Sequence, residues 1–214
     1  MKAVSSEAVE TGIVASLAQP GGNVTGMTSY PAQVTGKRLE LLKESFPKIS
    51  KVAVLGDPTI KLHELNWQEL KAVGRFLAVR LQSLEVRSPN PDFKGAFAEA
   101  TKERADGLLT LPSFLKFFHR KEIVALVAKN RLPAMFHQRD FVDDGGLMSY
   151  AANTIDSFRR AAVFVDKILK GAKPANLPVE LPKTFELIIN LKTAKQIGLT
   201  ISPNVLARAD KVIK

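Results

Sequence analysis

The chain has 214 residues, of which 45% are hydrophobic and 24% are charged, a composition typical of globular proteins. Lysine and arginine outnumber acidic residues by 31 to 21, but the basic residues are dispersed at helical spacings, so we expect no nucleic-acid partner. The absence of cysteine excludes disulfides and cysteine-based zinc sites. No segment approaches the roughly 20 apolar residues of a membrane span, so we also expect no direct membrane insertion.

The first element that the sequence predicts is a helix over residues 6–17. Ser6 is a favourable N-cap, apolar residues follow at helical spacing, and a Pro-Gly-Gly turn ends the segment. Residues 23–27 then read as a strand. The stretch GGNVTGMT resembles a phosphate-binding loop, but Met27 replaces the lysine and the stretch follows a helix instead of a strand. We therefore interpret its glycines as a helix end and a turn.

From residue 34 onward, short apolar runs alternate with amphipathic stretches. The expected strands lie at residues 52–55, 81–86, 107–111, 133–136, 147–150 and 185–189, and the expected helices at residues 34–46, 62–77, 115–129 and 154–170. Gly171 is a natural helix stop, and Ser202 with Pro203 starts a last helix. This alternation predicts an α/β fold with a parallel sheet covered by helices on both faces, and one compact lobe over residues 36–146.

Ligands of such sheets bind beyond the carboxyl ends of the strands. Ser113 and Phe114 follow a strand at the point where a helix begins. Ser113 could bind the carboxylate of a ligand, and Phe114 could stack on an apolar ligand. The alternative for Ser113 is that it only caps the helix. Each remaining candidate also has a structural alternative, such as a turn or core role. These candidates are Thr28, Ser29 and Tyr30 after the early strand, Asp57 for a ligand amine, His137 after a strand end, and Tyr150.

The sequence contains no recognisable catalytic or metal-binding arrangement. Its three histidines lack metal-ligand spacing, and no serine-hydrolase elbow occurs. Nothing assembles a nucleophile, a base and oxyanion donors. We therefore expect no enzymatic activity, no cofactor and no metal.

Several segments share the order and spacing of one protein family over nearly the whole chain. They are GIVASLAQPGGNVTGMTSY, GKRLELLKESFPKISKVAVLGDP, ADGLLTLPS, AKNRLPAMF, FVDDGGLMSY, FRRAAVFVDKILKGAKPANLPVE and FELIINLKTAKQIGLTISPNVLARAD. They resemble the ABC-transporter substrate-binding proteins related to the tryptophan- and tyrosine-binding proteins. The resemblance implies a type I periplasmic-binding-protein fold, with two α/β lobes, a hinge of crossing strands and a small solute in the cleft between the lobes.

The resemblance also implies a division of the chain. Residues 1–35 correspond to a remnant of the first lobe and a hinge strand, residues 36–146 to the second lobe, and residues 147–214 to a hinge strand, a first-lobe helix and a C-terminal strand and helix. By this comparison the chain is N-terminally shortened, and Ser6-Glu7 stands where the family often has Asp-Pro. Ser5 and Ser6 then fall on the first lobe's side of the cleft, which makes them candidate ligand contacts.

The function that this resemblance implies is that of the solute-binding component of an ABC-type importer. It would bind an amino acid or related carboxylate by hinge closure, work with an ABC permease and reside in the periplasm, although the first ten residues lack the apolar core of a signal peptide. The alternative is a truncated, non-transporting oligomeric or sensor module that binds no solute. We also expect a homo-oligomer, with the helices around residues 9–17 and 158–169 and the strand at 23–27 in its interface.

Overall fold

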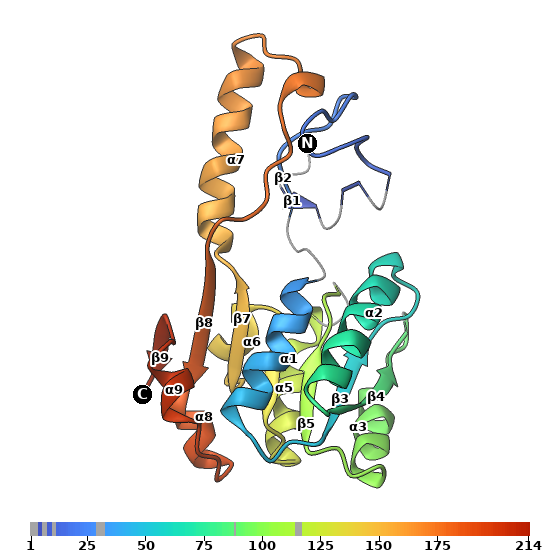
Figure 1. Ribbon diagram of the computed structural model, residues 1–214, viewed down its shortest axis with the longest axis vertical. Coiled ribbons are helices and arrows are strands. Elements are labelled where there is room, and N and C mark those ends of the chain that lie inside the picture. The colour runs from blue at the N-terminus through green and yellow to red at the C-terminus, as the bar shows by residue number, and fades with distance from the viewer. Residues whose placement is uncertain (1–3, 6–7, 10–11, 29–32, 88, 114–116) are drawn as a thin grey trace. The chain divides into compact units, whose positions relative to one another are not determined.

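The structure, a computed structural model, describes residues 4–5, 8–9, 12–28, 33–87, 89–113 and 117–214. The contacts within the chain divide it into two units (Figure 1). Unit 1 consists of residues 1–31 and 152–185, and unit 2 consists of residues 32–151 and 186–214. The chain therefore passes between the units at three places.

The main sheet has the strand order β4-β3-β5-β6-β7-β8-β9. The strands are β3 (Lys51–Gly56), β4 (Arg80–Glu85), β5 (Gly107–Thr110), β6 (Ala134–Phe136), β7 (Met148–Ala152), β8 (Phe185–Asn190) and β9 (Lys211–Ile213). From β4 to β7, and between β8 and β9, neighbouring strands pair in parallel. Hydrogen bonds from Asn190 N to Leu147 O and from Asn153 N to Thr184 O join β7 and β8 in opposite directions. The sheet is therefore mostly parallel.

Helices cover both faces of this sheet. They are α1 (Gln33–Ser45), α2 (Lys61–Phe76), α3 (Phe93–Lys102), α5 (Arg120–Lys129), α6 (Arg139–Asp143), α8 (Leu191–Gln196) and α9 (Pro203–Leu206). Alternate residues of β3 point to opposite faces of the sheet. Val52 and Val54 pack on one face in a core cluster with α1, α2, α8 and α9. Ala53 and Leu55 pack on the other face in a second cluster with α3, α5 and α6. The predicted α/β class, with helices on both faces of a mostly parallel sheet, is confirmed.

Most of the predicted helices and strands from residue 34 onward agree with the structure to within one or two residues. The helix predicted over residues 115–129 does not, because α5 begins only at Arg120 and position 119 lies in a turn.

Several short elements were also missed. The sequence analysis did not predict α3, α6, α8 or β9. Helix α3 had a readable signal, because Asp92 caps it by accepting a hydrogen bond from Gly95 N at 2.8 Å, and Phe93 and Phe97 follow on one buried face. Among the described residues, no helix is both long and apolar enough to cross a bilayer.

Unit 1 contains a small parallel pair of strands and one long helix. Strand β1 (Val4–Ser5) pairs with β2 (Met27–Thr28), and α7 (Thr154–Leu169) packs against both, with a 3-10 turn at Pro174–Asn176 further along the chain. The Asn153 side chain accepts a hydrogen bond from Asp156 N and caps α7. Gly171 follows the helix at a φ of 95°, which confirms the predicted stop.

The predicted helix over residues 6–17 is wrong. The described residues of this range form turns and bends, because Gly12 adopts a φ of 73° and interrupts any right-handed helix. Ile13 N and Val14 N both donate to Ala8 O, at 2.9 and 3.1 Å, instead of to the carbonyl four residues back. Ala8 and Val14 are buried in a cluster with Val179. The predicted strand at 23–27 is also shorter and displaced, since only Met27 and Thr28 pair as a strand.

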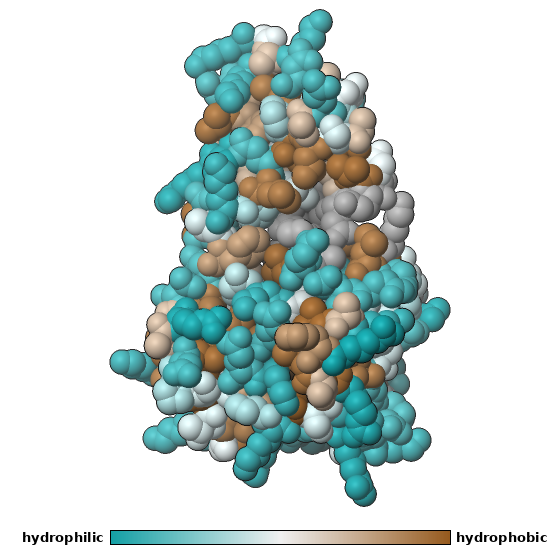
Figure 2. All heavy atoms as spheres, viewed as in Figure 1, coloured by the Kyte–Doolittle hydropathy of each residue, from teal (hydrophilic) through white to brown (hydrophobic). Residues whose placement is uncertain are grey.

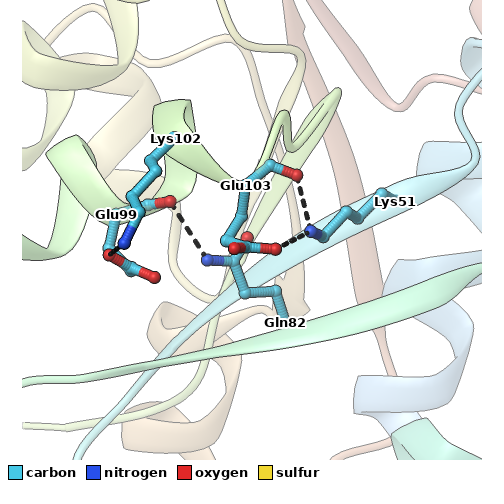
Figure 3. Close-up of polar contacts among 5 residues, drawn as sticks. All are labelled: Lys51, Gln82, Glu99, Lys102 and Glu103. Atoms are coloured by element: carbon cyan, nitrogen blue, oxygen red, sulfur yellow. Dashed lines mark hydrogen bonds and ion pairs between the residues drawn. The ribbon is translucent and has the colours of Figure 1, made fainter.

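The amino edge of the sheet is held by a charged cluster (Figure 3). Lys51, the first residue of β3, donates to Glu103 Oε2 at 2.9 Å, just after the end of α3. The hydrogen bond and the positive charge of Lys51 lower the pKa of the Glu103 carboxyl. Nearby, Gln82 Nε2 donates to Glu99 O at 3.3 Å. This cluster lies at the edge opposite the strand ends that are expected to bind a ligand, so we assign it a structural role.

Candidate functional site

The carboxyl edge of the sheet in unit 2 gathers four of the predicted site residues. Asp57 follows β3 directly, Ser113 lies three residues beyond β5, His137 follows β6, and Tyr150 lies within β7. Because these strands are parallel neighbours, their carboxyl ends share one edge. The predicted convergence of these strand ends is therefore observed, whereas ligand contact by each residue stays a prediction.

Asp57 is buried and shapes a tight turn. Its Oδ1 accepts hydrogen bonds from Thr59 N at 3.0 Å and from Thr59 Oγ1 at 2.6 Å. Gly56, just before it, has no room for a β-carbon because the His63 ring lies against its backbone. His63 in turn stacks on Trp67, with 6.2 Å between the ring centroids. The turn role of Asp57 is thus present, and His63 connects the neighbouring Gly56 to Trp67, the only tryptophan of the chain.

His137 is enclosed within the unit, at only 1% exposure. Its Nδ1 lies 2.9 Å from Thr110 Oγ1, and its backbone N donates to the same hydroxyl oxygen at 3.1 Å. Its ring also packs against Phe141, with centroids 5.1 Å apart. The side chain therefore ties β6 to β5 in this conformation.

A buried arginine that the sequence analysis did not single out organises the same edge. Arg38 on α1 is 0% exposed, and its Nε donates to Tyr150 O at 2.8 Å. Its Nη2 donates to His137 O and its Nη1 to Thr35 Oγ1, both at 3.4 Å. Thr35 Oγ1 donates in turn to Asn66 Oδ1 on α2. A polar network thus connects two helices to the ends of two strands.

The sequence contained a signal for this network. Positions 35, 38 and 42 lie three and four residues apart, so they share one face of α1, and Leu42 is fully buried. A basic residue in line with buried positions must either reach solvent or find acceptors within the fold. Arg38 takes the second course, since it is buried and donates to acceptors within the fold.

Ser113 and Tyr150 combine structural roles with their position at the edge. Phe117 N donates to Ser113 O at 3.2 Å, a backbone hydrogen bond between residues four apart. This bond is compatible both with the capping alternative and with ligand contact, and both stay predictions. Tyr150 is half-buried and packs against the core cluster that contains α1.

The remaining candidates belong to unit 1 or lie outside the described residues. Ser5 and Thr28 are register partners in the parallel pair of β1 and β2. Thr28 is buried, and its backbone N donates to Glu180 O at 2.9 Å. The structure thus brings these two residues together. The candidates outside the described residues are Ser6, Ser29, Tyr30 and Phe114.

Across the described part of the chain, no three or more histidine and acidic side chains gather as a metal site would require. The polar groups at the carboxyl edge are instead hydroxyls, carboxylate oxygens and backbone groups. These groups can bind a small polar molecule through hydrogen bonds and charge.

Comparison with known proteins gives consistent relatives. A curated tyrosine-binding protein from Clostridioides difficile (strain R20291) is 26% identical over 197 residues, which is 91% of this chain and 55% of that protein. The chain thus spans little more than half the length of this relative.

Solved structures agree with the fold. An ABC domain in complex with L-Trp from Streptococcus pneumonia has a TM-score of 0.88 and 25% identity, covering 99% of this chain and 70% of that one. A conserved domain protein from Vibrio cholerae has a TM-score of 0.86 and 25% identity, covering 97% and 69%. A LacI family regulator from Bifidobacterium animalis subsp. lactis, at 14% identity and a TM-score of 0.60 over 86% and 65%, shares the fold alone. The fold is that of type I periplasmic-binding proteins.

The profile of one family matches this chain from residue 1 to residue 213, and its description is ABC transporter substrate binding protein. The segments that pointed to this family are spread from residue 12 to residue 210 and lie inside the match. The protein therefore belongs to the ABC transporter substrate-binding protein family.

Proposed function

We propose that this chain is the solute-binding component of an ABC-type importer and that it performs no chemistry of its own. The observation that carries the proposal is the family match over residues 1–213, in a chain whose carboxyl edge gathers polar groups. The tyrosine-binding relative and the L-Trp complex support an amino acid, or a related small carboxylate, as the solute. The proposal includes an ABC permease as partner and the periplasm as location.

In this proposal the solute's two charged groups are bound by different strand ends. Ser113 O accepts a hydrogen bond from Phe117 N, and the hydroxyl of Ser113 suits a carboxylate. Asp57 uses Oδ1 for the turn with Thr59, which leaves its second carboxylate oxygen for an ammonium group. We include closure of a hinge, favoured by the higher affinity of the closed state for the solute, because the chain crosses between its units three times.

Calorimetric titration with L-Trp, L-Tyr, L-Phe, L-Leu and L-Glu tests this function. We expect saturable binding of at least one of these solutes with one site per chain. Asp57→Asn and Ser113→Leu should each weaken binding about tenfold, which corresponds to about 1.4 kcal/mol. Asp106→Asn is the matched control, because Asp106 is also a turn aspartate but binds Ser50 N and Lys51 N at the opposite edge.

The outcomes distinguish a wrongly assigned site residue from a wrongly assigned function. Unchanged affinity in Ser113→Leu would remove Ser113 from the site without affecting the function. The absence of a saturable signal for every solute would contradict solute binding and favour the alternative of a non-transporting oligomeric or sensor module.

A further inference from the structure

Arg38 is a cation that is enclosed completely within unit 2. Hydrophilic residues are spread over the surface of the molecule in Figure 2, where water surrounds their charges. Arg38 is instead 0% exposed, and its guanidinium donates to Tyr150 O at 2.8 Å and to His137 O at 3.4 Å. A desolvated cation is costly unless acceptors replace its water, and here the acceptors lie at the end of β6 and near the end of β7.

Arg38 joins two of the three segments by which the chain passes between its units. The chain leaves unit 1 between residues 31 and 32, and α1, the helix that carries Arg38, begins at Gln33. The chain returns to unit 1 between residues 151 and 152, one residue beyond Tyr150. The hydrogen bond from Arg38 Nε to Tyr150 O therefore ties the unit 2 ends of these two segments to each other.

The same network holds the first turns of α1 in place. Arg38 Nη1 donates to Thr35 Oγ1 at 3.4 Å, and Thr35 Oγ1 donates to Asn66 Oδ1 on α2. Asn66 Nδ2 donates in turn to Leu62 O at 2.8 Å. Thr35 and Asn66 are both buried, so water has little access to these bonds. Arg38 is thus fixed from the side of the helices, and it holds the end of β7 against them.

We propose that Arg38 is a positioning residue of the hinge, which fixes the unit 2 ends of two connecting segments and confines bending to the residues beyond them. This inference rests on the hinge closure of the proposed function. Arg38 acts without touching the solute, because its donors bind groups of the fold. Loose connecting segments lose more conformational entropy on closure than fixed ones. Loss of the anchor should therefore weaken the binding of every solute by about the same factor.

Hydrogen exchange of single amides, measured by NMR, tests the anchor without any solute. Arg38→Lys keeps the charge, but one ammonium group does not reproduce the geometry of the guanidinium donors. The reporter is Asn153 N, which donates to Thr184 O just beyond the β7 crossing. The reference is Leu108 N, which donates to Pro133 O inside the sheet. Exchange at Asn153 should accelerate at least about tenfold more than exchange at Leu108. Equal acceleration would indicate only a global loss of stability and would overturn the proposal.

Leu84→Ala is the matched control for stability. Leu84 is 2% exposed and packs in the cluster on the face of the sheet opposite α1, so its truncation destabilises unit 2 without touching the network. It should accelerate exchange at Leu108 without the excess at Asn153. Circular dichroism verifies that each variant is folded. If Arg38→Lys does not fold, Thr35→Val replaces it, since valine keeps the shape but removes one partner of Arg38. The same excess at Asn153 is then expected, and its absence would contradict the anchor.

Calorimetric titration tests the consequence for binding. For each of L-Trp, L-Tyr, L-Phe and L-Leu that the wild-type chain binds, Arg38→Lys should raise the Kd by one common factor of at least about five. Leu84→Ala should leave the Kd unchanged at a temperature where it is folded. Unchanged affinity in Arg38→Lys would overturn the proposal and leave the proposed function intact. The absence of saturable binding by the wild-type chain would contradict the proposed function and, with it, the role of Arg38 in closure.

Discussion

Arg38 is a buried cation whose hydrogen bonds reach three other residues of unit 2. Its guanidinium donates to Tyr150 O, His137 O and Thr35 Oγ1. Planar, multiple donors make arginine suited to this task, and a lysine would not reproduce their geometry. Arg38 therefore stabilises the carboxyl edge of the sheet by binding backbone carbonyl oxygens of Tyr150 and His137.

Replacing Arg38 should destabilise the protein strongly. Arg38→Ala leaves buried acceptors without their donor, so we expect the free energy of unfolding to fall by about 3 kcal/mol. Lys37→Ala is the neighbouring control, since the partly exposed pair of Lys37 and Glu40 contributes less than about 1 kcal/mol. Urea unfolding followed by circular dichroism measures both. If the two substitutions cost the same, the network has no structural importance.

The lowered pKa of Glu103 predicts that the free energy of unfolding depends weakly on pH. Lys51 lowers the pKa of this carboxyl below its ordinary value of 4.5 in the folded state. Its contribution to stability is therefore present above the unfolded pKa and is lost as the pH falls through the folded pKa. Glu103→Gln removes the titration, so the stability difference between wild type and variant should shrink towards zero between about pH 6 and about pH 3. A difference that grows as the pH falls would refute the assignment.

At the scale of elements, the turn that leads into β7 is packed more tightly than its sequence indicates. Gly146 N donates to Phe141 O at 2.7 Å, and a β-carbon at Gly146 would lie 2.6 Å from that same carbonyl oxygen and from the Phe136 ring. The rings of Phe136 and Phe141 are themselves stacked, with centroids 4.9 Å apart. Glycine is therefore required here by space, since its backbone needs no left-handed conformation.

Gly146→Ala should consequently destabilise unit 2. Because the clash involves a backbone carbonyl that cannot rotate away, we expect a loss of about 2 kcal/mol in thermal or urea unfolding. Gly22→Ala serves as control, since no described atom lies within 4 Å of a β-carbon there and its φ is ordinary. That substitution should change stability by less than about 0.5 kcal/mol. Equal stability of the two variants would show that the turn can relax.

At the scale of the whole molecule, the two units differ in how much core they contain. Unit 2 has two large apolar clusters, one on each face of its sheet, whereas the clusters of unit 1 are centred on Ala8 with Val14 and Val179, and on Met27 with Ala161 and Phe164. Since burial of apolar surface is the main source of stability, unit 1 should be the weaker of the two.

We therefore expect two non-coincident transitions in urea. Trp67 lies in unit 2 and is the only tryptophan, so its fluorescence should report the second transition, while circular dichroism also reports the earlier loss of α7. Ala161→Asp, in the buried face of α7, should lower the first midpoint and leave the fluorescence midpoint unchanged. Coincident transitions by both probes would show that the units unfold as one.

The candidate site was predictable in part. The sequence predicted that three residues lie at one edge of the sheet, because each follows a parallel strand and the ends of parallel strands share an edge. These residues are Asp57, Ser113 and His137. The burial of His137 against Thr110 and the turn that Asp57 makes with Thr59 did not follow, because each depends on a neighbour that only packing brings close. Whether these residues contact a solute stays a prediction.

The sequence by itself determined the α/β class, the long helices α1, α2 and α7, and the family. These features are encoded by local apolar periodicity and by ordered segments, which need no knowledge of distant contacts. The tertiary structure decided the rest. Residues 12–17 have an apolar pattern suited to a helix, yet Gly12 and the contacts of Val14 with Ala8 and Val179 fold them into turns. Arg38 lies within a helix whose two lysines are half-buried. Only the closeness of the β6 and β7 ends explains the full burial of Arg38, because carbonyl oxygens there replace the water that its charge would otherwise need.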